Sequence, residues 1–464
     1  MSTTVLRGGT VWTGGQTPRL LPEHDVVITD GLVVALEPRA VVRADEEIEA
    51  ENCLVLPGLI NAHVHAGCTP HIRGMTEDAP IPAEGAFYHA LGTVLMLGYQ
   101  RLEPDELAAL VEWDAIAMLL GGATTIVEES FGGHEVWIEL VERLGFRSDL
   151  GLTYPNSVGA IGYVQGGRIV STGPGDVGAQ FQAGLDLHRT MHGAFSDRLR
   201  IHLSPHGPDT VPEDILRETR RMSDQLGVNA NLHLAQHLSE RRTIAERTGK
   251  TSVQYLHDIG FLGPRVMAMH VTFVEPDDIV LLAQTGTNVV HDSYRKAKEA
   301  LISPYWDFVA AGVNVALATD SFSHDLIQDL RFTAMLAKIR AGDVATPTAR
   351  HVLKSATYGA AKALNRPDLG HLEPGARGDV TVVGLDSPFN SPVFDPLRAL
   401  VYYSGARDIR CTLVDGRPVV RDGRVLGTDM PAVARRARLA AEKVWAMAQA
   451  EGVVSRHACG CGQH

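Results

Sequence analysis

Strand-like and helical segments alternate eight times between Leu56 and Leu369, and this repetition constrains the fold more than any other feature of the chain. The apolar, β-branched runs expected to form strands cover residues 56–65, 123–129, 148–155, 198–206, 229–236, 265–273, 287–292 and 314–321. Amphipathic stretches lie between them, and several begin at Pro followed by an acidic residue and end at Gly. The alternation predicts an α/β protein with a parallel (β/α)8, TIM-like barrel. An open doubly wound sheet would need a Gly-rich phosphate loop after its first strand, which the sequence lacks.

Both ends of the chain have a different pattern, with short β runs separated by Gly and Asp-Gly turns. We expect residues 1–56 and 371–430 to pair as one small β-sandwich domain, with 57–370 as the catalytic barrel and 431–464 as a C-terminal helix and tail. The tail contains His457, Cys459, Cys461 and His464. This cluster resembles a metal clip, but its terminal, Gly-rich context favours an exposed tail.

The charge balance excludes some classes of partner. The chain has 42 Lys and Arg against 55 Asp and Glu, a formal net charge of −13. Nucleic acids and anionic membranes need basic patches, so neither is expected as a partner. The N-terminus lacks the pattern of an export signal, and no apolar run approaches the length of a membrane span. The sequence therefore predicts a cytoplasmic protein that acts on a small molecule.

Histidine and aspartate residues end the predicted barrel strands. His63 and His65 lie two residues apart on the first strand, so their side chains share one face and can bind one cation. Later strands end with His206, His233, His270, His291 and Asp320. Catalytic residues of such barrels gather where the C-terminal strand ends converge. The pattern predicts a metal site at that end of the barrel.

Several motifs taken together resemble the amidohydrolase superfamily. They are PGLINAHVH (57–65), the histidines that end the fifth and sixth strands, TDS (319–321) and the returning segment LEPGARGDVTVV (372–383). The motifs HIRGM (71–75), SPHGPDTV (204–211) and HLAQ (233–236) are similar to those of its triazine-hydrolase and S-adenosylhomocysteine-deaminase branch. The resemblance implies a metal site of His63, His65, His233 and Asp320. It also implies that His270 polarises a substrate carbonyl or assists proton transfer. We further expect a homo-oligomer, a dimer or tetramer.

Three imidazoles and one carboxylate suit a divalent ion, with Zn²⁺ expected and Co²⁺, Fe²⁺ or Mn²⁺ as alternatives. Asp320 can accept a proton from the attacking water and pass it to the leaving group. Superfamily members with two metals bridge them with a carboxylated lysine on the fourth strand, and this chain has no lysine before Lys250. We therefore expect one ion per chain, because Glu128 and Glu129 are poorly placed to substitute for that lysine.

Some residues differ from the family pattern, and these differences bear on which substrate the enzyme binds. Deaminases of this branch carry Glu three residues after the strand-five His, where this chain has Gln236, which cannot donate and recover a proton. A carbonyl substrate needs no ring protonation, so the sequence favours hydrolysis of a urea, carbamate or thiocarbamate, and it resembles phenylurea and molinate hydrolases. If the substrate is such a carbonyl compound, Gln236 binds it, and Asp320 or His237 protonates the leaving amine. The alternative is an aminohydrolase or chlorohydrolase acting on a nitrogen heterocycle such as a triazine, pterin or guanine. A catalytically silent assembly subunit is a more remote alternative.

Further polar residues near the predicted site are candidates for contact with substrate. They are Arg73, His89, His206, His291 and His324. His206 and His291 can also orient the metal ligands from behind. Lys296 and Lys298 are expected to be solvated surface charges.

Overall fold

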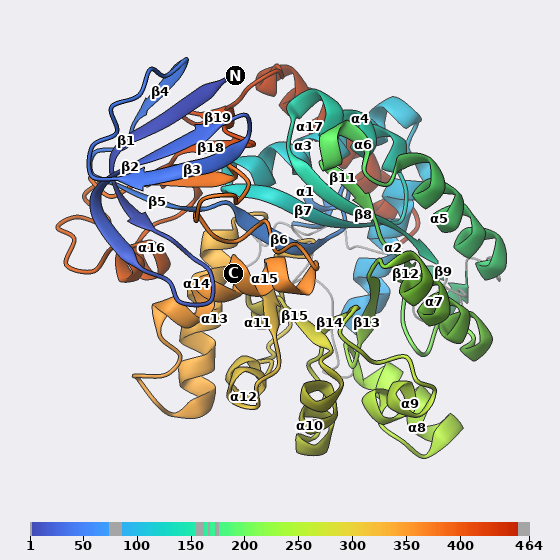
Figure 1. Cartoon of the computed structure of the whole chain (residues 1–464). Helices are drawn as coiled ribbons and strands as arrows, with labels where there is room; N and C mark the ends of the chain where they lie inside the picture. Colours follow the sequence, from blue (N-terminus) through green and yellow to red (C-terminus); the bar gives the residue numbers. More distant parts are fainter. Residues whose placement is uncertain (1, 74–85, 155–161, 166–167, 172–175, 453–464) are drawn as a thin grey trace, which may run out of the picture.

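The eight predicted strand segments are all present. The structure, a computed structural model, describes residues 2–73, 86–154, 162–165, 168–171 and 176–452 (Figure 1). The strands of the central region are β6 (Leu59–Val64), β7 (Ala123–Ser130), β8 (Arg147–Tyr154), β11 (Leu199–Ile201) with β12 (Ser204–Pro205), β13 (Ala230–Leu234), β14 (Val266–His270), β15 (Asn288–His291) and β16 (Val315–Leu317). A short hairpin, β9 (Gly162–Gln165) and β10 (Arg168–Ser171), follows β8.

These strands form two parallel sheets rather than one closed ladder, so the prediction of a closed barrel holds only in part. One sheet has the order β11-β8-β7-β6, with β12 paired to β8, and the other has the order β13-β14-β15-β16. At one seam the backbone amide of Asn231 donates to the carbonyl of Leu203, and at the other that of Asp320 donates to His63. The seam strands β11, β12 and β16 are too short to extend these contacts into regular pairing. The seams nevertheless bring the ends of β6, β13 and β16 together.

Helices cover the outer side of the strands, and their ends match the sequence signals. For example, α10 begins at Pro276 after Glu275 and ends at Gly286, whose φ of 70° favours glycine. The helices are α1 (Thr69–Ile72), α2 (Ala86–Arg101), α3 (Pro104–Leu120), α4 (His134–Leu144), α5 (Val177–Met191), α6 (Ala194–Asp197), α7 (Glu213–Leu226), α8 (Leu238–Thr248), α9 (Ser252–Asp258), α10 (Pro276–Thr285), α11 (Ser293–Lys298), α12 (Tyr305–Ala310), α13 (Leu326–Ala341), α14 (Ala349–Ser355), α15 (Tyr358–Ala363), α16 (Pro396–Tyr403), the 3₁₀ turn Ala406–Asp408 and α17 (Met430–Ala450).

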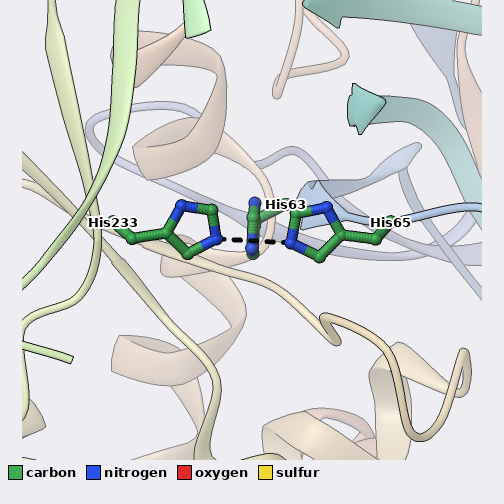
Figure 2. Close-up of side chains that lie close together, drawn as sticks. All are labelled: His63, His65 and His233. Atoms are coloured by element: carbon green, nitrogen blue, oxygen red, sulfur yellow. Dashed lines mark hydrogen bonds between the residues drawn. The ribbon is translucent and has the colours of Figure 1, made fainter. Parts of the chain in front are cut away.

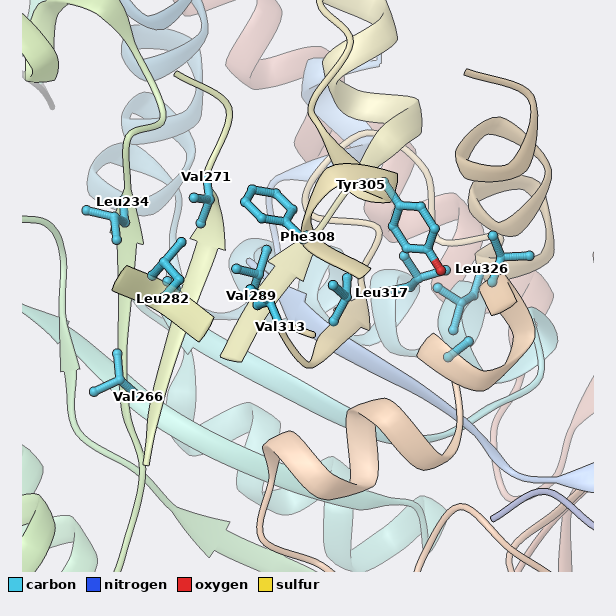
Figure 3. Packing of buried hydrophobic residues seen from close by; sticks show 14 of the residues in the cluster. Leu234, Val266, Val271, Leu282, Val289, Tyr305, Phe308, Val313, Leu317 and Leu326 are labelled. Atoms are coloured by element: carbon cyan, nitrogen blue, oxygen red, sulfur yellow. The ribbon is translucent and has the colours of Figure 1, made fainter. Parts of the chain in front are cut away.

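The largest apolar core lies between the second sheet and its helices. Figure 3 shows Val266 and Val289 of the sheet beside Leu282 of α10 and Phe308 of α12. All residues of β13 and β14 are buried. Strands buried on both faces appear in the sequence as continuous apolar runs, so histidines within them stand out.

The strands from the two ends of the chain form one sheet. Its order is β20-β19-β18-β17-β5-β1-β2-β3, with β4 paired to β1 (Figure 1, upper left). The strands are β1 (Thr3–Trp12), β2 (Leu20–Thr29), β3 (Leu32–Glu37), β4 (Glu46–Glu49), β5 (Cys53–Pro57), β17 (Val380–Gly384), β18 (Ile409–Val414), β19 (Arg417–Arg421) and β20 (Arg424–Val425). The predicted β-sandwich is not confirmed, because the described strands make a single nine-stranded sheet in which β5 and β17 pair directly.

A buried ion pair joins this sheet to the central strands. Arg147 of β8 donates from Nε and Nη2 to both carboxylate oxygens of Asp379, each at 2.9 Å, and Nη2 lies 2.8 Å from Asp415. The terminal cluster of His457, Cys459, Cys461 and His464 lies outside the described residues. No helix in the described part of the chain has both the length and the apolar character needed to cross a membrane.

Candidate metal centre

Three histidines from two strands converge on one point. His63 lies on β6, His65 directly follows that strand, and His233 lies on β13. Their Nε2 or Nδ1 atoms form a group within 4.8 Å, and the Nε2 atoms of His65 and His233 are 3.3 Å apart (Figure 2). All three residues are at most 5% exposed. The structure thus brings together the three imidazoles that the sequence suggested as metal ligands.

Asp320, which follows β16, supplies an oxygen atom to the same point. Its Oδ1 lies 3.9 Å from Nε2 of His63 and 4.0 Å from Nε2 of His65. A tetrahedral zinc ion with bonds of roughly 2.1 Å needs ligand atoms about 3.4 Å apart, so small adjustments would complete the geometry. Both ring nitrogens of His63 are buried with no hydrogen-bond partner among the described residues. The ring of His63, which lacks a hydrogen-bond partner there, and the three imidazole nitrogens with one carboxylate oxygen together fit a divalent cation.

Two backbone carbonyls orient the other imidazoles. Nδ1 of His65 donates to the carbonyl of Glu129 at 2.7 Å, and Nδ1 of His233 donates to the carbonyl of His206 at 3.0 Å. In each ring the opposite nitrogen, Nε2, then carries the lone pair that faces the cluster. Burial lowers the pKa of His65 to about 4 and lowers the pKa of His233 well below its usual value. Both rings are therefore neutral, as metal ligands must be.

His270, at the end of β14, lies beside this group. Its Nδ1 is 3.0 Å from Oδ2 of Asp292, and its Nε2 is 3.9 Å from Oδ2 of Asp320. Burial lowers the pKa of His270 well below its ordinary value. A neutral ring that donates from Nδ1 to Asp292 presents a proton-accepting Nε2 toward Asp320. The structure thus places His270 where it can take part in proton transfer.

Arg295 is a residue of the site that the sequence pattern did not indicate. Arg295 lies on α11, is 3% exposed, and its Nε is 2.8 Å from Oδ2 of Asp320. Burial alone would raise the pKa of Asp320, but the charge of Arg295 holds it well below its ordinary value. The amide of Gln236 fits its neighbours when its oxygen accepts from Nη2 of Arg295 at 3.2 Å and from Nε2 of His237 at 3.2 Å. Arg295 therefore links Gln236 to the metal-site carboxylate.

Lys296 is buried, so the prediction that it is a solvated surface charge is wrong. Its side chain has no exposed area, and its Nζ lies 3.0 Å from Oε2 of Glu299. The carboxylate of Glu299, directly after the end of α11, compensates the positive charge of Lys296 that burial would otherwise penalise. Lys298 is partly buried, with its Nζ 4.5 Å from the ring centroid of Phe322.

The other predicted substrate contacts lie in different environments. The ring of His206 stacks at 4.6 Å on that of His233, and its Nδ1 bonds with Thr210. His291 bonds with Ser293 and packs against Tyr305. Both ring nitrogens of His324 contact protein groups, Nε2 at Thr69 and Nδ1 at Thr319. Arg73 is exposed just after α1, and the side chain of His89 lies outside the described part of the structure. Among the four whose side chains the structure describes, His206 is the one placed directly against a candidate metal ligand.

Glu129 of β7 lies against the backs of two ligand rings. Its carboxylate is fully buried, with Oε1 3.6 Å from Nδ1 of His63 and Oε2 3.8 Å from Nδ1 of His233. Burial alone would raise the pKa of Glu129, but the charge of His63 lowers it below its usual value. The neighbouring Glu128 instead accepts a hydrogen bond from the backbone amide of Ala66.

Comparison with known proteins identifies relatives that match nearly the whole chain. Residues 54–419 match the model of the amidohydrolase family. A 5′-deoxyadenosine deaminase of Methanosarcina acetivorans is 32% identical over 93% of this chain and 95% of its own. A 5-methylthioadenosine/S-adenosylhomocysteine deaminase of Haloarcula marismortui is 31% identical over 92% of this chain and 96% of its own.

Solved structures share the fold at lower sequence identity. A zinc-bound adenosine deaminase from Xanthomonas campestris aligns with a TM-score of 0.85 at 23% identity, covering 96% of this chain and 99% of its own. A zinc complex of atrazine chlorohydrolase from Arthrobacter aurescens aligns with a TM-score of 0.81 at 24% identity, covering 94% of this chain and 100% of its own.

The comparisons correct the predicted reaction. The expected hydrolysis of a phenylurea- or thiocarbamate-type substrate is wrong, because the relatives that match most of the chain are named deaminases. The resemblance to deaminases is supported, a triazine hydrolase shares the fold, and the resemblance to phenylurea and molinate hydrolases is not shown. The prediction depended on Gln236, but one altered side chain does not outweigh similarity to deaminases over more than nine-tenths of the chain.

Proposed function

The chain belongs to the amidohydrolase family of metal-dependent hydrolases that act on carbon–nitrogen bonds, and we propose that it deaminates an amino-substituted nitrogen heterocycle, with an adenosine-type nucleoside as the first candidate. In this reaction water replaces the exocyclic amine, giving the oxo heterocycle and ammonia. The observation that carries the proposal is the 31–32% identity, over more than nine-tenths of the chain, to relatives named as deaminases of adenosine derivatives.

We assign the metal to His63, His65, His233 and Asp320, with zinc as the proposed ion and one ion per chain. A divalent ion held by these residues would lower the pKa of a bound water from about 15.7 toward about 7, which supplies the nucleophile at neutral pH. The absence of lysine before Lys250 supports the single ion.

Asp320 and His270 are the proposed proton carriers. Oδ1 of Asp320 faces the histidine cluster, while Oδ2 faces Nε2 of His270 at 3.9 Å. Oδ2 can therefore accept the proton of the attacking water without leaving the metal site, and Asp320 or His270 can pass it to the departing amine. The bond from His270 to Asp292 holds the imidazole in the orientation that this transfer needs.

Gln236 has a binding role in this proposal. Because its amide oxygen faces Arg295 and His237, its NH₂ group remains available as a donor. That group can donate a hydrogen bond to a ring nitrogen beside the reacting carbon, which polarises the carbon–nitrogen bond without transferring a proton. The positive charge of Arg295 can further stabilise electron density that moves onto the ring.

The proposal is tested by incubating the metal-replete protein with 5′-deoxyadenosine, 5-methylthioadenosine, S-adenosylhomocysteine and adenosine. Ammonia release and the change in ultraviolet absorption report deamination. An aminotriazine, a chlorotriazine and an aryl urea extend the panel. We expect ammonia from at least one adenosine derivative. Turnover of the aryl urea alone, or chloride release without deamination, would overturn the proposal.

A further inference from the structure

Glu129 contacts two of the candidate metal ligands through different groups. Its backbone carbonyl accepts the Nδ1–H of His65 at 2.7 Å, and its side-chain Oε1 lies 3.6 Å from Nδ1 of His63. The third ligand, His233, has its Nδ1 3.8 Å from Oε2. One residue of β7 thus lies behind three imidazoles whose other nitrogens are available to the metal.

Neither carboxylate oxygen of Glu129 has a hydrogen-bond partner in the described part of the chain, because both contacts to the histidine rings are longer than a hydrogen bond. Its exposed fraction is 0%, so it cannot be solvated from the surface. A buried charge without a partner is costly, and such a group is retained where something nearby compensates it. The nearest candidates are Nδ1 of His63, which also has no hydrogen-bond partner among the described residues, and the cation expected on the other side of that ring.

Charge balance supports a link with the cation. Three neutral imidazoles, the Asp320 carboxylate and a divalent ion together carry a net charge of +1 in a site whose four residues are all buried. The carboxylate of Glu129 offsets this charge, while the charge of Arg295 beside Asp320 is offset by Glu299, whose Oε1 lies 3.3 Å from Nη2 of Arg295. An electroneutral group is the less expensive arrangement inside a protein, because burying net charge is penalised.

We propose that Glu129 is a positioning residue of the metal centre. Its carboxylate accepts a hydrogen bond from Nδ1–H of His63, and its backbone carbonyl accepts one from Nδ1–H of His65. The negative charge of the side chain also balances the positive charge of the ion. When a cation binds Nε2 of His63, Nδ1–H becomes a stronger donor and the 3.6 Å contact closes to a hydrogen bond. The inference rests on the metal centre and is independent of which heterocycle the enzyme deaminates.

The test is zinc affinity, measured without substrate by competition with a chromophoric chelator. Glu129→Gln keeps the shape of the side chain and removes its charge. We expect it to weaken zinc binding by about 10- to 100-fold, the usual effect of losing a partner of a ligating histidine. Glu129→Asp keeps the charge, so its affinity should fall between those of the wild type and Glu129→Gln. Glu128→Gln is the matched control, because this neighbouring buried carboxylate faces the amide of Ala66 and should leave the affinity close to wild type.

Two further readouts distinguish positioning from general structural support. The visible absorption bands of the Co²⁺-substituted protein report ligand geometry and should change in Glu129→Gln but not in Glu128→Gln. The circular dichroism spectrum of the metal-free Glu129→Gln protein should match that of wild type, so that a weaker zinc affinity cannot be ascribed to loss of the fold. Wild-type zinc affinity in Glu129→Gln, or an equal loss in Glu128→Gln, would overturn the proposal. Neither result depends on deamination, so failure of the proposed function would remain separately visible.

Discussion

Nε of Arg295 lies 2.8 Å from Oδ2 of Asp320, while the other oxygen of the same carboxylate faces His63. Asp320 is therefore shared between the metal site and a buried guanidinium group. Both side chains are 3% exposed, so water screens their attraction only weakly. In the metal-free protein Arg295 is the nearest positive charge available to Asp320, and in the metal-bound protein the cation provides a second.

Substituting Arg295 should therefore destabilise the metal-free protein more than the zinc-bound protein. Arg295→Met removes one partner of a buried pair, which typically costs about 3–5 kcal/mol. Zinc bound to Asp320 compensates part of that loss, so we expect zinc to raise the melting temperature more in Arg295→Met than in the wild type. Thermal unfolding with chelator and with excess zinc measures both values. An equal zinc-induced rise in the melting temperature of the two proteins would contradict the inference that Asp320 is shared between the metal site and Arg295.

Loss of His63 should abolish both metal binding and catalysis. His63→Ala removes an imidazole whose Nε2 lies 3.9 Å from Asp320 and whose ring centroid lies 4.7 Å from that of His65, and the remaining donors cannot complete a four-ligand site. Elemental analysis of the purified variant should show far less than one zinc per chain, and ammonia release should fall to background. His257→Ala, which changes a half-exposed histidine on α9, is the control and should keep its metal and activity. Full activity in metal-poor His63→Ala would contradict the assigned centre.

Restoring the family glutamate at position 236 should not by itself produce a faster enzyme at neutral pH. Arg295 and His237 surround that position, and a nearby positive charge lowers the pKa of a carboxyl group. The new carboxyl of Gln236→Glu would be ionised at neutral pH and unable to donate a proton to the ring. As the pH falls toward its pKa the acid form accumulates, so the activity of the variant relative to wild type should rise. A pH profile of kcat/KM for both proteins checks this, and a variant faster than wild type at neutral pH would contradict it.

The sequence indicated where the candidate metal site lies because its residues end strands, and the resemblance to the amidohydrolase superfamily selected four of them as ligands. His63 and His65 share the end of one apolar run, His233 and Asp320 end two others, and parallel strands bring such ends together. It could not assign Glu129, because two adjacent glutamates on one strand face opposite sides and only the register shows which side is which. It also missed Arg295, because α11 is a short helix after a strand end, where no periodic pattern indicates burial. Lys296 was misassigned for the same reason, since its partner Glu299 is close only once that helix forms.

Gly151 of β8 leaves room for a buried histidine close to the centre, and substituting it should disturb that strand. A Cβ at this position would lie 2.3 Å from Nε2 of His202, whose Nδ1 is held by Asp149 at 3.1 Å. Gly151→Ala therefore forces the imidazole or the strand to move, and overpacking of this kind costs about 1–3 kcal/mol. Gly184→Ala on α5 is the matched control, because a Cβ there meets nothing within 4 Å and alanine favours the helix by roughly 0.5–1 kcal/mol. Denaturant unfolding should show opposite changes in the two variants, and a stability equal to wild type in Gly151→Ala would show that His202 can move at no cost.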